Sequence, residues 1–109
     1  MYTNAAKQLK QNTKVVMDSF QTSGLSVTSF NIKPDSDGAC TFYIELQGQS
    51  LTRDVEIKVN LYDKEGDIYT MERTTLYDDF NGYDTISIFF SDEDILNCVS
   101  AARIYACPQ

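Results

Sequence analysis

Residues 55–68 are the feature of this sequence that most limits the folds open to the chain. Apolar and polar residues alternate from Val55 to Leu61, which is the pattern of a strand with one buried face. The charged residues that follow cannot be buried, and Gly66 can adopt the positive φ that a tight reversal needs. A second strand begins at Ile68. The segment therefore predicts a β-hairpin.

The same two-residue period recurs along most of the chain, with turn-forming residues between the runs. The apolar phase changes after Val27, so we expect a β-bulge there, and the mixed segment 68–76 suits a sheet edge. Residues 91–97 predict an acidic loop or a short helical turn that the residues 91–94 could cap. Strands are predicted at residues 25–32, 40–46, 55–61, 68–76, 86–90 and 98–106. Six or seven short antiparallel strands predict a mainly β fold, an immunoglobulin-like β-sandwich.

The N-terminal residues 3–20 have a helical period instead. Side chains suited to one buried face recur at spacings of three and four, at Ala6, Leu9, Thr13, Val16 and Phe20. The apolar stripe is narrow, so this helix needs a surface, either its own sandwich or a partner, as in a homo-oligomer. For 109 residues we expect one domain, with a helix and linker in 1–24 and the β-sandwich in 25–109.

The hairpin also carries a family resemblance. Leu61, Tyr62 and Asp63 end the first strand, and the sequence from Val59 to Ile68 resembles the hallmark of the FxLYD family, with Val59 at the family's phenylalanine position. Members are small bacterial β-sandwich modules, often found in envelope or extracellular proteins. The resemblance covers roughly residues 25–106 and implies a fold. It carries no catalytic residue, because the family motif is structural.

Cysteine and histidine content limits the chemistry. Cys40, Cys98 and Cys107 are an odd set without a CxxC pair, so we expect reduced thiols, with a Cys98–Cys107 bridge as the open alternative. Histidine is absent, which excludes Ser-His, Cys-His and His-metal arrangements. The acidic turns do not fit a calcium-loop pattern, and no phosphate-binding glycine loop occurs. We therefore expect no enzyme activity, no cofactor and no metal.

The net charge of −7 is unevenly distributed, since the first residues are basic and the second half is acidic. This balance disfavours direct binding to nucleic acid or to anionic membranes. It leaves open a small acidic inhibitor that mimics nucleic acid and occludes a basic protein surface. The residues expected to form that acidic patch are Asp63, Glu65, Asp67, Asp78, Asp79 and Asp84.

A row of outward aromatic side chains is the main candidate for a partner-binding surface. The alternation that places residues 42, 61, 88 and 104 inside forces their neighbours outward. Large, partly polar rings suit an interface, although the N-terminal helix could instead cover them. The expected contact residues are Tyr43, Tyr62, Phe89 and Tyr105, with Arg103 as a polar partner.

These observations predict a non-catalytic protein–protein interaction module of bacterial type. The alternatives are the acidic inhibitor and a structural subunit of a larger assembly. The N-terminus has no signal-type hydrophobic segment, so we expect a cytoplasmic location. A chain cut from a longer protein would instead belong to the cell envelope or the extracellular space. No apolar run is long enough to span a membrane.

Overall fold

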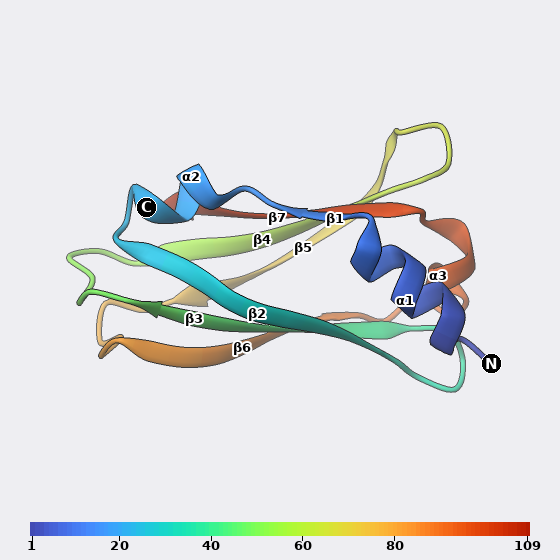
Figure 1. The fold of residues 1–109 in the computed structure, drawn as a ribbon, viewed down its shortest axis with the longest axis horizontal. Helices are drawn as coiled ribbons and strands as arrows, with labels where there is room; N and C mark the ends of the chain where they lie inside the picture. Colours follow the sequence, from blue (N-terminus) through green and yellow to red (C-terminus); the bar gives the residue numbers. More distant parts are fainter.

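Two β-sheets pack face to face in the computed structural model, which describes residues 1–109 (Figure 1). The elements in chain order are α1 (Thr3–Gln11), β1 (Thr13–Val15), α2 (Met17–Gln21), β2 (Leu25–Pro34), β3 (Cys40–Gly48), β4 (Val55–Tyr62), β5 (Ile68–Leu76), β6 (Tyr83–Phe90), α3 (Ile95–Cys98) and β7 (Ala101–Pro108). Sheet A has the strand order β1-β7-β4-β5 and sheet B the order β2-β3-β6. All neighbours are antiparallel except β1 and β7. The chain is therefore an immunoglobulin-like β-sandwich, as predicted.

The core lies between the sheets and is built from alternate residues of each strand. β3 and β4 bury every second side chain, and the residues between these point outward. Phe42 and Phe90 pack edge to face, with ring centroids 5.7 Å apart. Ala102, Ile104 and Ala106 point inward from β7, as the sequence predicts. Burial of this continuous apolar layer is the main force that holds the two sheets together.

Three local predictions are confirmed. The hairpin β4–β5 reverses at Gly66, which has φ +86°, and the Asp63 Oδ1 accepts hydrogen bonds from the backbone N–H groups of residues 65 and 67. The β2–β3 register shifts between Val27 and Ser29, which is the expected bulge. β5 is an edge strand of sheet A.

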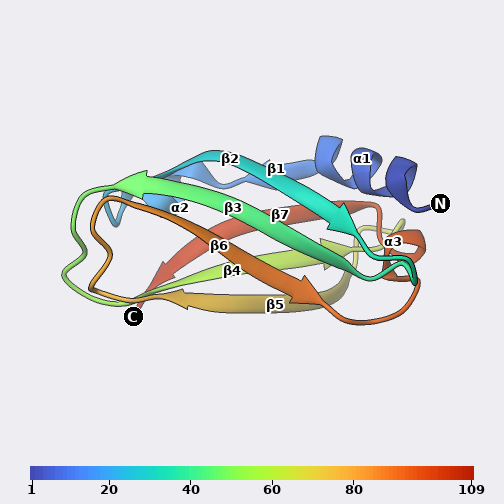
Figure 2. The same ribbon diagram turned by 90° about the horizontal axis from the view of Figure 1, so that it is seen from below.

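The prediction of one helix over residues 3–20 is wrong in its middle. β1 interrupts it by pairing with β7, and the Val16 N–H donates to the Ile104 carbonyl at 2.8 Å. Thr13 and the two valines after it have β-branched side chains, which lose rotamer freedom in a helix. This segment therefore pairs with β7 as a strand and does not continue the helix. The helices on either side still bury Leu9 and Phe20 in the core. Figure 2 shows α1, β1 and α2 along one side of the sandwich, next to β2.

At the C-terminal end the predicted helix cap is wrong, whereas the prediction of reduced thiols is confirmed. α3 begins after Asp94 without a side-chain cap, because the Asp94 Oδ1 accepts hydrogen bonds from Asn97 Nδ2 and from the Tyr2 hydroxyl instead. The alternative Cys98–Cys107 bridge does not form, and all three thiols are free. Cys98 ends α3 before β7 begins, and Cys107 lies near the far end of β7, so the length of the strand holds the two thiols far beyond the reach of a disulfide. None of the helices is long and apolar enough to cross a membrane.

Candidate functional site

The five predicted contact residues all point outward, but they do not form one row. Tyr43 and Phe89 lie on the outer face of sheet B, because β3 pairs with β6. Tyr62, Arg103 and Tyr105 lie on the outer face of sheet A, because β4 pairs with β7. The alternation of a strand tells which residues point outward, but it does not tell to which sheet the strand belongs. The predicted single row is therefore wrong.

The N-terminal helix does not cover these side chains, contrary to the alternative considered from the sequence. α1 and α2 contact β2 and β7 at the side of the sandwich. On sheet B, Tyr43 and Phe89 are 38% and 53% exposed. Lys33 reaches over the Tyr43 ring at 5.1 Å, which is the one cation–π contact on this face. Both outer faces are thus open.

The outer face of sheet A has an organised centre at Asn60, which is the one buried polar residue of the molecule at 8% exposure. Its Nδ2 donates to the Tyr62 hydroxyl at 3.2 Å, and its Oδ1 accepts from the Tyr105 hydroxyl at 3.2 Å. The same Tyr105 hydroxyl lies 3.7 Å from the Met71 sulfur. Two tyrosine rings from different strands are therefore tied to one amide on a solvent-facing sheet. Asn60 was missed from the sequence, because its partner Tyr105 is 45 residues away.

Cations surround this centre. Lys14 lies directly opposite Arg103, and Lys58 lies directly opposite Arg73. Glu56 is the one carboxylate on the face, and it pairs with Arg73 at 3.2 Å in the one ion pair of the molecule. We call the outer face of sheet A the tyrosine–cation face and define it by Lys14, Lys58, Asn60, Tyr62, Arg73, Arg103 and Tyr105. It is a positively charged surface on a chain with a net charge of −7.

An open cleft of about 400 Å³ adjoins this face where β1, β7 and the β4–β5 loop meet. Lys14, Lys64 and Arg103 line it, together with Tyr62 and Asn12. Asp63 is the one carboxylate in its lining, and its Oδ1 is already bonded to the backbone of its own loop. The cleft therefore presents more donors than acceptors.

The six residues of the predicted acidic patch are divided between two places. Asp63, Glu65 and Asp67 lie in the β4–β5 loop, whereas Asp78, Asp79 and Asp84 lie in or just after the β5–β6 loop. Figure 1 shows these loops at opposite ends of the molecule, whose long axis measures 41 Å. The prediction of one acidic patch is therefore wrong, since a hairpin strand separates its two halves.

Other carboxylates gather where α1 begins. Asp94 hydrogen-bonds to the Tyr2 hydroxyl, and this bond, with the nearby charges of Asp37 and Glu93, raises the pKa of Tyr2. The loops that carry Asp37 and Asp94 are joined by a backbone hydrogen bond of 2.8 Å. No group of three or more His, Cys, Asp or Glu side chains is arranged to hold a metal ion.

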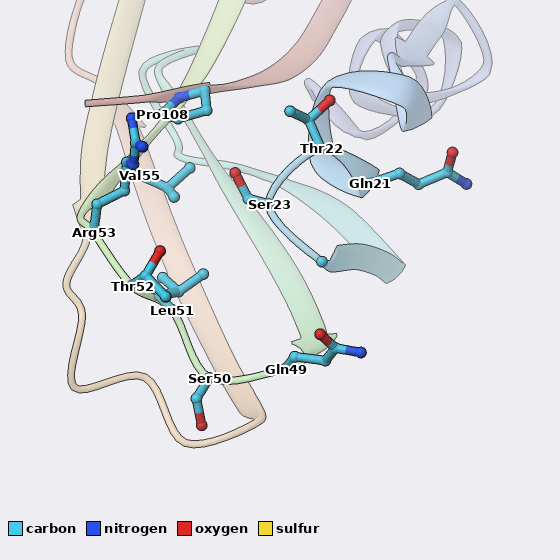
Figure 3. A pocket seen from close by; sticks show the side chains of 11 residues that line it. Gln21, Thr22, Ser23, Gln49, Ser50, Leu51, Thr52, Arg53, Val55 and Pro108 are labelled. Carbon is cyan, nitrogen blue, oxygen red and sulfur yellow. The ribbon is translucent and has the colours of Figure 1, made fainter.

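A pocket of about 520 Å³ lies at the other end of the sandwich from α1, between the α2–β2 turn and the β3–β4 loop (Figure 3). Hydroxyl and amide side chains line most of it, and Gln21 and Ser50 point away from its centre. Arg53 is its one titratable side chain, and the Arg53 Nη1 donates to the Gln109 carbonyl at 3.2 Å. A guanidinium stays protonated, so the pocket contains no general acid–base pair.

The thiol of Cys40 is held in its neutral form. Burial in the core, with a smaller effect from the charge of Asp35, raises the pKa of Cys40 to about 12. Since the thiolate is the reactive species, Cys40 has the character of a structural core residue.

Comparison with known proteins identifies other structures with a similar fold. No family model matches the chain, and no curated protein sequence matches it. The structure is similar to Cj0090 of Campylobacter jejuni, with a TM-score of 0.53 and 16% identity over 90% of this chain and 98% of that one. It is also similar to IrmA of Escherichia coli, with a TM-score of 0.49 and 16% identity over 79% of this chain and 77% of that one. At this identity the likeness to Cj0090 shows a shared β-sandwich fold.

Proposed function

We propose that this protein is a non-catalytic protein-interaction module that binds its partner through the tyrosine–cation face. The observation that carries the proposal is the position of Asn60. A buried amide on an outer sheet face, bonded to two tyrosine hydroxyls, has no role in the core between the sheets. Its effect is to fix Tyr62 and Tyr105 at the centre of a solvent-facing surface. The resemblance to the FxLYD family agrees with a non-catalytic role, because the family motif is structural.

The arrangement suits an interface for a physical reason. Tyrosine and arginine are enriched among the residues that contribute most to binding energy, particularly near the centre of an interface. Side chains that are already held in place lose less conformational entropy when a partner binds. On sheet A the rings are tied to Asn60, whereas Phe89 on sheet B has no polar group to tie it. This difference favours the face of sheet A over that of sheet B.

The test compares two matched double variants. Tyr62→Ala with Tyr105→Ala removes both rings from sheet A, and Tyr43→Ala with Phe89→Ala removes two exposed rings from sheet B. Each variant and the wild type are immobilised, and bound proteins are quantified from a lysate of the source cells. We expect a specific partner to be lost only from the sheet A variant, with circular dichroism showing both variants folded. Equal retention by a folded sheet A variant would contradict the proposal.

The two alternatives have less support from the geometry. An acidic mimic of nucleic acid needs a continuous array of charge, and the six predicted carboxylates lie at opposite ends of the sandwich. Assembly through the N-terminal helix needs a free apolar stripe. Leu9 and Phe20 instead fill the core of their own chain.

A further inference from the structure

The cations of the cleft beside Tyr62 come from three separate elements. Lys14 belongs to β1, Lys64 to the β4–β5 loop and Arg103 to β7, and all three are exposed. None of them is in an ion pair, because the single ion pair of the molecule joins Glu56 and Arg73. The chain has sixteen acidic side chains, yet only Asp63 lies in the lining of this cleft, against three cations.

The β1–β7 register brings two of these unpaired cations close together. Lys14 and Arg103 are directly opposite on adjacent strands, so their side chains emerge on the same face. Like charges in that position destabilise a sheet. One row further along, Lys58 is directly opposite Arg73. Glu56 pairs with Arg73 in that second row, so Lys14 and Arg103 are the opposed pair that is left without a carboxylate. An anionic partner that neutralises them on binding would explain this arrangement.

The neutral groups of the cleft also favour an anion. The Tyr62 hydroxyl accepts a hydrogen bond from Asn60 Nδ2, which leaves its own proton free to donate. Asp63 is the one acidic residue in the lining, and its Oδ1 already accepts hydrogen bonds from two backbone N–H groups of its own loop. An incoming oxyanion therefore meets two ammonium groups, a guanidinium and a phenol O–H, which are donors for charge-assisted hydrogen bonds.

We propose that this cleft is a carboxylate-binding site, where an extended acidic segment of the partner protein docks; this rests on the tyrosine–cation face being the binding surface. The Lys14–Arg103 row and the Lys58–Arg73 row are two residues apart along the strands. That separation is about 7 Å, and alternate side chains of an extended peptide have the same spacing. Glutamates at every second position of such a segment would face the two rows in turn, while the tyrosine rings lie against the backbone of the segment.

The experiment uses peptides as defined probes. The ¹⁵N-labelled protein is titrated with a Glu-Gly repeat peptide, with the Gln-Gly repeat of equal length, and with inorganic phosphate. We expect the Glu-Gly peptide alone to bind saturably and to shift the amide signals of residues 12–14, 62–66 and 100–105. Lys14→Gln with Arg103→Gln should weaken this binding by about tenfold or more. The matched control is Lys7→Gln with Lys33→Gln, which removes the same charge from α1 and sheet B and should keep wild-type affinity.

Two results of these titrations would overturn the proposal. Equal weakening in both double variants would overturn the proposal, because it would show a response to net charge alone. Saturable binding of phosphate at these amides without binding of the Glu-Gly peptide would overturn the assignment to an acidic protein segment. Thermal unfolding gives a second readout: removal of the opposed Lys14 and Arg103 charges should leave the unfolding temperature unchanged or raise it, and a large decrease would reveal a structural role instead.

The test also distinguishes this site from the broader proposal. If the cellular partner does not need Tyr62 and Tyr105 but the Glu-Gly peptide still binds the cleft, the protein-interaction proposal for the face fails, and the docking of that partner's segment fails with it. The cleft then remains a carboxylate-binding site for the peptide alone. If the partner needs both rings but the peptide does not bind, the carboxylate site fails and the face remains the binding surface.

Discussion

Replacement of Asn60 by alanine is the sharpest test of the organised face. The substitution removes two hydrogen bonds, each 3.2 Å long, from a residue that is 8% exposed. A net contribution of about 0.5–1.5 kcal/mol for each bond gives a loss of about 1–3 kcal/mol. The two tyrosine hydroxyls lie in half-buried residues and can bond to water afterwards, so we expect the lower part, about 1–2 kcal/mol. For a chain of this size that loss lowers the unfolding temperature by roughly 4–8 °C.

The assay is urea unfolding followed by circular dichroism, with Asn81→Ala in the exposed β5–β6 loop as the matched control. That control should stay within about 0.5 kcal/mol of the wild type. A double-mutant cycle with Tyr105→Phe then isolates the Asn60–Tyr105 bond, and its coupling energy should be about 0.5–1 kcal/mol. A coupling below about 0.3 kcal/mol, which is within the additivity of unconnected sites, would refute the idea that Asn60 fixes the rings.

Three further predictions concern the fold around the site. Leu9→Ala, at a 2% exposed position of α1, should cost about 2–5 kcal/mol in urea unfolding, and a loss near zero would mean that α1 is not part of the folded unit. Gly38→Ala should destabilise more than Gly66→Ala, since both need φ near +90° but only a Cβ at Gly38 would meet other atoms, at 2.7 Å; equal losses would contradict this. Cys40 should resist iodoacetamide until the protein unfolds. Because burial raises its pKa from 9.0 to about 12, the unfolded chain loses this proton first, so the contribution of Cys40 to stability is full below pH 9 and falls between pH 9 and 12. Cys40→Ala should remove that part of the pH dependence.

The local pattern of the sequence was enough to predict which apolar residues of β3, β4 and β7 point into the core. The hairpin at Gly66 and the bulge after Val27 depend on neighbours along the chain, and both are confirmed. Long-range pairing was not predictable in this way. Nothing in the alternation of β4 indicates that its outer residues lie beside β7 and not beside β3. Hence Tyr62 and Tyr43 were expected on one surface and lie on two.

The cations of the tyrosine–cation face also depend on a long-range pairing that the sequence pattern did not predict. Lys14 was expected within the helix predicted over residues 3–20. Its position opposite Arg103 exists only because β1 replaces the middle of that helix and pairs with β7. The outcome was set by the free backbone edge of β7, which offers hydrogen bonds to any nearby extended segment. The helical period of residues 3–20 gives no information about a strand edge that forms about 90 residues later in the chain.

Ionic strength distinguishes the contributions of the rings and the cations to binding. Between about 0.1 M and 1 M salt the Debye length falls from about 10 Å to 3 Å, so exposed charge pairs are screened while apolar burial is not. A partner held by the tyrosine rings alone would be unaffected, and one held by Lys14, Lys64 and Arg103 alone would be lost. The proposed face uses both, so affinity should fall with salt to a finite level. That residual binding should disappear with Tyr62→Ala and Tyr105→Ala, because at high salt the rings are what remains to hold the partner.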